Sequence, residues 1–160
     1  MSERPEGFRR VAQALAAAGH PHEPLWLEVP ARTSQEAADA LGVQLGQIAK
    51  SVVFRRKADD VAVLVVTSGD RRVDEKRVAA VTGPLARADA DFVKARTGFV
   101  IGGVSPVAHL SPPVTLVDRE LQRFDDIWAA AGHPNGVFRL TVVQLLALTG
   151  APLHDVVLQP

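Results

Sequence analysis

The stretch that decides the fold is Thr97-Gly-Phe-Val-Ile-Gly-Gly-Val-Ser-Pro-Val-Ala-His109. Its apolar residues 99–101 predict a short buried strand, which Gly102 and Gly103 then interrupt. Paired glycines after a strand let backbone N–H groups approach a ligand with no Cβ in the way, and Pro106 fixes φ in the turn that follows. A tight turn between two strands explains the same residues, because Gly-Gly pairs are common in loops. The stretch therefore predicts either a ligand-binding loop or a plain turn.

The composition predicts one folded domain over residues 1–160. Of the 160 residues, 47% are apolar and 22% are charged, which is ordinary for a globular protein. Lys plus Arg equal Asp plus Glu at 18 each, so the overall charge does not favour a polyanion, although a local basic patch is compatible with it. No apolar run approaches the roughly 20 residues of a membrane span, and Met1–Gly7 has no signal-peptide core. We expect a cytoplasmic protein that does not bind a membrane.

Helix and strand patterns alternate along the chain and predict an α/β fold. Helices are predicted at 5–18, 34–41, 75–81, 89–96 and 142–148. Strands are predicted at 25–29, 51–54, 61–66, 85–88, 114–117 and 137–140, whereas 125–131 is ambiguous and 153–158 is extended or a short tail. The apolar run 51–54 predicts a strand covered on both faces. Together with the run 61–66, which follows a turn at Asp59-Asp60, it predicts a central hairpin. Thr33 and Glu36 form a capping box before the helix at 34–41, and Gly42 ends that helix.

Few side chains in the sequence could bind a metal ion or act as a nucleophile. The chain has no Cys, which excludes a disulfide, a thiolate nucleophile and a Cys-type zinc site. His20 and His22 flank a proline, but zinc needs three or four ligands and no third one is nearby. Ser105 is the obvious candidate nucleophile, yet it lies outside a G-x-S-x-G elbow and has no assigned base. We expect no metal and no cofactor, and we interpret Ser105 as a loop donor.

Four strings occur in a fixed order: TSQEAA at 33–38, QIAKSVVF at 47–54, GDRRVD at 69–74, and TGF running into GGVSP at 97–106. Together they resemble the YbaK/EbsC family, the free-standing aminoacyl-tRNA deacylases related to the editing domain of bacterial prolyl-tRNA synthetase. The resemblance covers about 33–155. It implies a single domain with a mixed, barrel-like β-sheet flanked by helices and a substrate cleft beside the glycine loop. It also implies hydrolysis of the ester that joins a wrong amino acid to the 3′-terminal adenosine of a tRNA, usually tRNA(Pro).

The resemblance also assigns site residues. Lys50 matches the family's near-invariant lysine, and Gly102–Pro106 match the loop that binds the aminoacyl carbonyl, where backbone donors would stabilise the oxyanion. The family is held to activate water through the substrate's own ribose hydroxyl. His133 lies where some members, the alanine-specific type among them, carry a His-Pro pair. The candidate catalytic residues are Lys50, Gly102, Gly103, Val104 and Ser105, and the candidate substrate-binding residues are Phe54, Ser68, Gly69, Pro106, Asp118 and His133.

Several of these residues have an equally plain structural explanation. Lys50 is also explained as an edge lysine that extends to solvent. His133 and His109 are also explained as turn residues that only form hydrogen bonds, and Asp118 is also explained as the cap of a turn. Two basic clusters, Arg9-Arg10 and the four cations within 71–77, are either solvated helix faces or a phosphate track for the acceptor stem.

The sequence does not determine which amino acid would be removed from the tRNA, or whether the protein is an enzyme or a binding module. A synthetase pocket built for proline cannot strongly reject a smaller residue, because a methylene is worth only about 1–3 kcal/mol, so alanine and cysteine are both expected errors. The segments 107–109 and 132–135 depart from the cysteine-clearing members and favour alanine or a broad small-residue preference. The expected partners are aminoacyl-tRNA and prolyl-tRNA synthetase. A non-catalytic module that binds a tRNA 3′ end or a synthetase is the main alternative, and a small-molecule esterase or nucleotide-binding protein ranks last.

Overall fold

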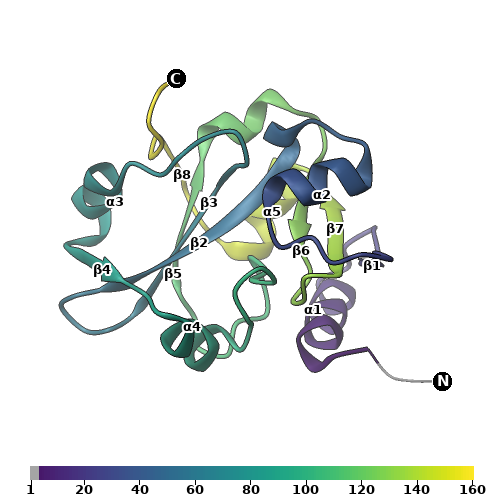
Figure 1. Cartoon of the computed structure of the whole chain (residues 1–160). Coiled ribbons are helices and arrows are strands. Elements are labelled where there is room, and N and C mark those ends of the chain that lie inside the picture. The colour runs from purple at the N-terminus through teal and green to yellow at the C-terminus, as the bar shows by residue number, and fades with distance from the viewer. Residues whose placement is uncertain (1–3) are drawn as a thin grey trace.

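One mixed eight-stranded sheet organises the computed structural model, which describes residues 4–160 (Figure 1). The strand order is β1-β7-β6-β2-β3-β5-β8, and β4 pairs with β2 beside this path. The strands are β1 (Leu25–Trp26), β2 (Ile48–Arg56), β3 (Ala62–Ser68), β4 (Leu85–Arg87), β5 (Val114–Asp118), β6 (Ile127–Ala130), β7 (Gly136–Leu140) and β8 (Leu153–His154). The helices are α1 (Glu6–Ala17), α2 (Ser34–Leu41), α3 (Glu75–Thr82), α4 (Ala90–Thr97) and α5 (Val142–Thr149), with short 3₁₀ helices η1 (Leu45–Gln47) and η2 (Arg119–Arg123). The expected α/β fold with a mixed sheet flanked by helices is confirmed.

The helices begin and end at the residues that the sequence marks. The Thr33 hydroxyl accepts the Glu36 N–H while the Glu36 carboxylate accepts the Thr33 N–H, and Gly42 follows in the left-handed conformation with φ 68°. Asp74 and Asp89 accept backbone N–H groups at the starts of α3 and α4. These contacts satisfy donors that a helix leaves free in its first turn, and the predicted helices are confirmed to within one or two residues at each end.

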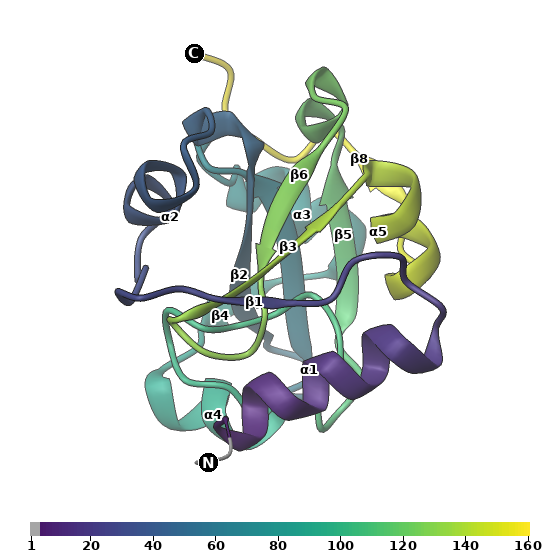
Figure 2. The same ribbon diagram turned by 90° about the vertical axis from the view of Figure 1, so that its right-hand side faces the viewer.

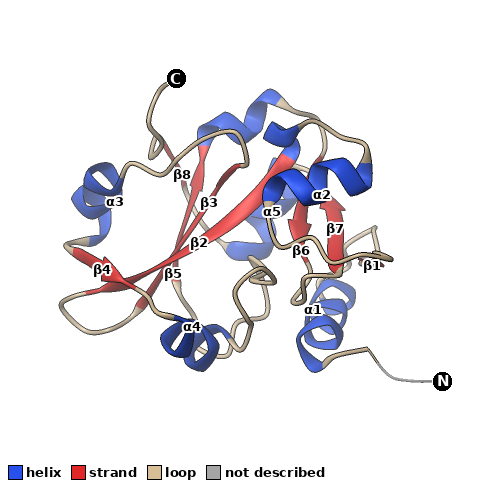
Figure 3. Cartoon of the chain, viewed as in Figure 1, coloured by secondary structure: helices blue, strands red, loops and turns tan. Residues whose placement is uncertain are grey.

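Helices cover both faces of the sheet (Figures 2 and 3). Helices α1 and α5 pack on one face, where their apolar side chains join Leu64 and Val66 of β3 in the largest core cluster. Helices α2 and α3 pack on the other face, α2 against Ile48 and α3 against Val63 and Val65. Every residue of β3 is buried, which is typical of a strand covered on both faces. Residues 51–54 of β2, for which we expected the same coverage, are only half-buried because one edge of β2 borders a cavity.

The strands that lie outside the central hairpin differ most from the predictions. Residues 99–101 form no strand: Phe99 is buried, but Val100 and Ile101 are 47% and 62% exposed. The Val100 carbonyl instead accepts the Gly103 N–H and closes a turn, so the predicted buried strand is wrong. Strand β1 is shorter than predicted, and the ambiguous segment 125–131 contains β6. None of the helices within residues 4–160 is long and apolar enough to cross a membrane.

Candidate active site

Strand β2 has a gap in its pairing along one edge. Strand β3 pairs with the opposite edge of β2 continuously from Ala49 to Arg55. On the gapped edge, β6 pairs in parallel with Ile48 and Ala49 only, and β4 pairs antiparallel with residues 54–56. Residues 50–53 therefore have no strand neighbour on this edge, within the part of the chain that the structure describes.

Ser51 directs its backbone groups into this gap. The Arg56 N–H donates to Val61 next to β3, whereas the Lys57 N–H donates to Pro84 next to β4. Because successive peptide groups in a strand point to alternate edges, the odd-numbered residues of β2 face the gap. The Ser51 hydroxyl is also buried and has no hydrogen-bond partner among the described residues. Ser51 thus offers an N–H, a carbonyl and a hydroxyl, and buried polar groups are rarely left unpaired.

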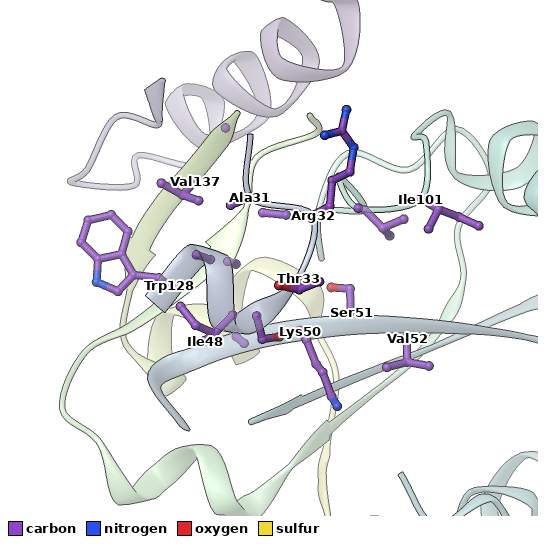
Figure 4. Close-up of a pocket in the computed structure, with 18 of the residues that line it drawn as sticks. Ala31, Arg32, Thr33, Ile48, Lys50, Ser51, Val52, Ile101, Trp128 and Val137 are labelled. Atoms are coloured by element: carbon purple, nitrogen blue, oxygen red, sulfur yellow. The ribbon is translucent and has the colours of Figure 1, made fainter. Parts of the chain in front are cut away.

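A cavity of about 430 Å³ occupies the gap (Figure 4). Helix α2 and the segment before it form one wall, and α4 with the glycine loop forms another. The wall side chains are mostly small and apolar, among them Ala88, Val53, Val93 and Val104. None of the lining residues, all of which lie within residues 4–160, is Asp or Glu, and the only two charged ones are Arg32 and Lys50. The cavity is therefore mostly apolar with two cationic side chains in its lining, and it is suited to a small group that carries an anion nearby.

Lys50 lines the cavity but extends to the opposite side of β2 from Ser51 (Figure 4). Its ammonium group has no hydrogen-bond or ion-pair partner among the described residues. Burial lowers the pKa of Lys50 from its ordinary value, Arg72 lowers it further, and Asp70 opposes both. Asp70 is itself engaged by Arg123, which donates to both of its carboxylate oxygens at 2.8 and 3.1 Å. Lys50 is thus a half-buried cation without a counterion in contact, which leaves it able to bind an incoming anion or oxygen.

The glycine loop forms the rim of the cavity with backbone rather than side chains. Gly102 and Val104 line the cavity, and Gly102 adopts φ 92°, a conformation that favours glycine. The Gly103 N–H donates to the Val100 carbonyl at 3.0 Å and is therefore already used. No hydrogen bond within residues 4–160 uses the N–H groups of Gly102, Val104 or Ser105. The Gly102 and Val104 donors line the cavity and remain available to a ligand, whereas Ser105 is buried outside the lining and the Gly103 donor closes the turn.

The His133 turn supports the glycine loop from behind. A Cβ on Gly103 would lie 2.8–2.9 Å from the backbone atoms of His133, so the two segments are in direct backbone contact. The His133 ring stacks on Trp26 with centroids 4.8 Å apart, and its Nδ1 accepts the Asn135 N–H at 3.0 Å. Burial, followed by the nearby Arg32, lowers the pKa of His133, which favours the neutral ring. His133 does not line the cavity itself, so its position fits a supporting role.

Ser105 and Pro106 are buried beneath the loop. The Ser105 hydroxyl is fully buried and accepts the Val107 N–H at 3.4 Å, which disfavours it as a nucleophile. The Ser105 carbonyl is 2.6 Å from His109 Nε2, which must carry the proton because a carbonyl only accepts. His109 Nδ1 is buried without a partner among the described residues, and burial lowers the pKa of this ring. His109 therefore fixes the loop from below and does not reach the cavity.

Three further candidates, Phe54, Ser68 and Gly69, lie away from the cavity. Phe54 packs in the core cluster under α3. The Ser68 hydroxyl donates to the Gly46 carbonyl and accepts from Arg123 at 2.9 Å, and a Cβ on Gly69 would clash with the backbone of η1. All three connect β3 to its neighbours, and none of them lines the cavity.

Asp118 is fully buried and joins three segments. Its carboxylate accepts the Glu120 N–H at the start of η2 and the Val156 N–H near the C-terminus, both at 2.9 Å. This geometry matches the turn cap that the sequence offered as the alternative to a substrate-binding role.

The two basic clusters do not form one surface. Helices α1 and α3 lie at opposite ends of the molecule (Figures 1 and 2). Arg10 is used internally: it donates to the carbonyls of Ala108 and Thr97 at 2.8 and 3.0 Å and lies over Phe99. The two clusters therefore lie on separate parts of the molecule, and internal contacts hold the Arg10 side chain.

Sequence reasoning missed two residues of the site, Arg32 and Ser51. Ser51 had a signal, since it is the one hydroxyl residue in the otherwise apolar run 51–54. Arg32 had almost none, because a charged residue before a helix cap is usually a solvated loop residue.

The chain is similar to known proteins in both its sequence and its structure. The sequence profile of the aminoacyl-tRNA editing domain matches residues 28–148. The chain is 36% identical over 119 residues to the uncharacterized protein YwhH of Bacillus subtilis, a match that covers 74% of this chain and 75% of YwhH. It is 25% identical over 126 residues to EbsC of Enterococcus faecalis, a candidate Cys-tRNA(Pro)/Cys-tRNA(Cys) deacylase, covering 78% and 76% of the two chains. A crystal structure of a candidate trans-editing enzyme for prolyl-tRNA synthetase superimposes with a TM-score of 0.90 at 38% identity, over 98% of this chain and 100% of the other.

Proposed function

Because the chain belongs to the family of aminoacyl-tRNA editing domains, we propose that it is a trans-editing hydrolase acting in the cytoplasm. It would deacylate mischarged tRNA, above all tRNA(Pro) that carries alanine or another small residue, and its activity would complement that of prolyl-tRNA synthetase. The observation that carries this proposal is the cavity at the gap in β2. There, backbone donors, a hydroxyl and two cations, all without partners among the described residues, surround a space of about 430 Å³.

The chemistry needs no protein nucleophile. A water oxygen bonds to the ester carbonyl carbon, the bond from that carbon to the ribose oxygen breaks, and the ribose oxygen takes up a proton. The products are the free amino acid and a tRNA with a free hydroxyl. The main requirement is to stabilise the oxyanion of the tetrahedral intermediate, and the free N–H groups of Gly102 and Val104 support this role. Lys50 would bind the terminal ribose and stabilise the charge that develops there.

The amino group of the substrate requires a different partner. An aminoacyl ester carries an α-ammonium group, and no carboxylate lines the cavity within the described part of the chain to pair with it. The neutral acceptors at the gap, the carbonyl and hydroxyl of Ser51, are the groups that suit it. A small side chain would then face the apolar wall that includes Val53 and Val93, where alanine fits more easily than a larger residue.

The test is release of labelled amino acid from Ala-, Cys-, Ser- and Pro-tRNA(Pro). We expect selective release of one non-proline residue by the wild type and none by Lys50→Ala. Lys57→Ala, which removes an exposed charge at the β2–β3 turn, is the matched control and should remain active. Ser51→Ala should raise KM by about tenfold, as the loss of a hydrogen bond to a charged group predicts.

Two results would contradict the proposal. Full activity of Lys50→Ala would remove the assigned role of this lysine. No release from any of the four substrates, with tRNA still bound, would mean that the fold serves here as a binding module for a tRNA 3′ end or a synthetase.

A further inference from the structure

Arg32 lies at the mouth of the cavity with its charge unmatched. Its side chain is exposed and has no hydrogen-bond or ion-pair partner among residues 4–160. Figure 4 shows the guanidinium extending away from Lys50 and Ser51, on the outer side of the cavity. Elsewhere on the surface Arg56 and Arg139 each contact a carboxylate at 2.7–2.8 Å. An arginine beside a cavity without such a partner is available to a ligand anion.

The fold holds Arg32 in this position through its backbone and its aliphatic stem. The Ala31 N–H donates to the Pro134 carbonyl at 2.7 Å, which fixes the chain next to the His133 turn. Directly after Arg32, Thr33 begins α2 with its capping box. The stem lies across Gly102, since a Cβ there would be 3.3 Å from Arg32 Cγ. The guanidinium also depresses the pKa of His133, as a nearby positive charge must. Arg32 is therefore held where the glycine loop, the His133 turn and α2 meet.

The charges of the substrate restrict what Arg32 can bind. The aminoacyl end of a charged tRNA carries a cationic ammonium group and a neutral ester, and its anions are phosphodiesters. The oxyanion of the intermediate forms deeper in the cavity, at the glycine loop. We propose that Arg32 binds the phosphate on the 5′ side of the terminal adenosine while the aminoacyl group occupies the cavity. This inference rests on the proposed function and adds the subsite that recognises the nucleotide. A guanidinium suits this task because its planar fork can donate to two phosphate oxygens at once.

The experiment compares two small esters that differ only in that phosphate. They are the aminoacyl esters of adenosine and of adenosine 5′-monophosphate, made with the amino acid that the tRNA assay releases fastest. For the wild type we expect a kcat/KM about tenfold higher with the phosphate, the size typical of a hydrogen bond to a charged group. Arg32→Ala should lose this preference because its KM for the phosphate-bearing ester rises. Arg32→Lys should keep part of the preference, and Lys57→Ala should keep all of it.

A second measurement uses the full tRNA substrate. For single-stranded nucleic acid, each phosphate contact contributes about 0.7 to the slope of log affinity against log salt concentration. Arg32→Ala should therefore flatten the salt dependence of kcat/KM on aminoacyl-tRNA by about that amount, and Lys57→Ala should not.

The outcomes separate this inference from the proposed function. If Arg32→Ala lowers the rates on both esters equally, or leaves both the preference and the salt slope intact, then Arg32 does not bind the phosphate although the enzyme is a deacylase. If the wild type hydrolyses neither the esters nor any aminoacyl-tRNA, the proposed function itself is wrong, and the phosphate subsite is rejected with it.

Discussion

Gly103→Ala tests whether the glycine loop owes its position to backbone contact with the His133 turn. The added Cβ would lie 2.8 Å from His133 Cα and 2.9 Å from its N and C atoms. Ordinary contact begins near 3.4 Å, so the two segments must separate by about 0.6 Å. No side chain can rotate to relieve the clash, because all three atoms are backbone. Gly103 has no positive φ, and so the effect is steric rather than conformational.

The displacement should affect stability and catalysis differently. Overpacking of this kind costs about 1–3 kcal/mol, which for a chain of this length lowers Tm by about 3–10 °C. Donors that move by several tenths of an ångström no longer match the oxyanion, and misplacement by 1 Å can cost about 100-fold in rate. We expect kcat for deacylation to fall by about 10- to 100-fold in single-turnover assays at a temperature where the variant is folded.

Gly83→Ala is the control for this prediction. Gly83 has φ 94°, and no described atom lies within 4 Å of the place that an added methyl group would take, so alanine there strains the backbone without moving the loop. It should lower Tm and leave kcat unchanged. A Gly103→Ala variant with full kcat would refute the view that the loop's contact with the His133 turn sets the geometry of the donors.

Two further predictions concern residues that the sequence singled out. Lys50→Met should be at least as stable as the wild type at neutral pH, because it removes a half-buried charge without a partner among the described residues. The pKa of Lys50 is lowered from 10.5 in the folded protein, so the unfolded chain binds the proton more tightly. In denaturant titrations the free energy of unfolding of the wild type should therefore rise relative to that of the variant as the pH rises towards 10.5. Asp118→Ala leaves the N–H groups of Glu120 and Val156 without an acceptor, so it should lower the free energy of unfolding in urea by about 2–5 kcal/mol. The kcat of the folded fraction should be unchanged. A loss of kcat without a loss of stability would instead support Asp118 as a substrate-binding residue.

The parts of the fold that depend on local interactions could be predicted from the sequence, and those that depend on distant pairing could not. The capping box at Thr33, the glycine that ends α2 and the β2–β3 hairpin each involve neighbours in the chain, and all three are confirmed. The gap in β2 depends on where β6 ends and β4 begins, and these two strands lie far from β2 in the sequence although both pair with one of its edges. Val100 and Ile101 gave a wrong strand prediction for a similar reason, since two exposed apolar residues in a loop have the same sequence pattern as a buried strand.

The gap also explains why this site needs a mixed sheet. An unpaired strand edge exposes backbone donors and acceptors, which proteins usually cover because they invite aggregation. Here β6 approaches the edge of β2 in parallel and β4 approaches it antiparallel, so each covers one end and neither continues across residues 50–53. Helix α2 and the glycine loop then enclose the uncovered part as a cavity. The aminoacyl group would take the place of the missing strand neighbour at Ser51, with Lys50 on one side of the strand and Arg32 at the mouth. A substitution that extended β4 towards Ser51 would therefore close the site without touching any of these three side chains.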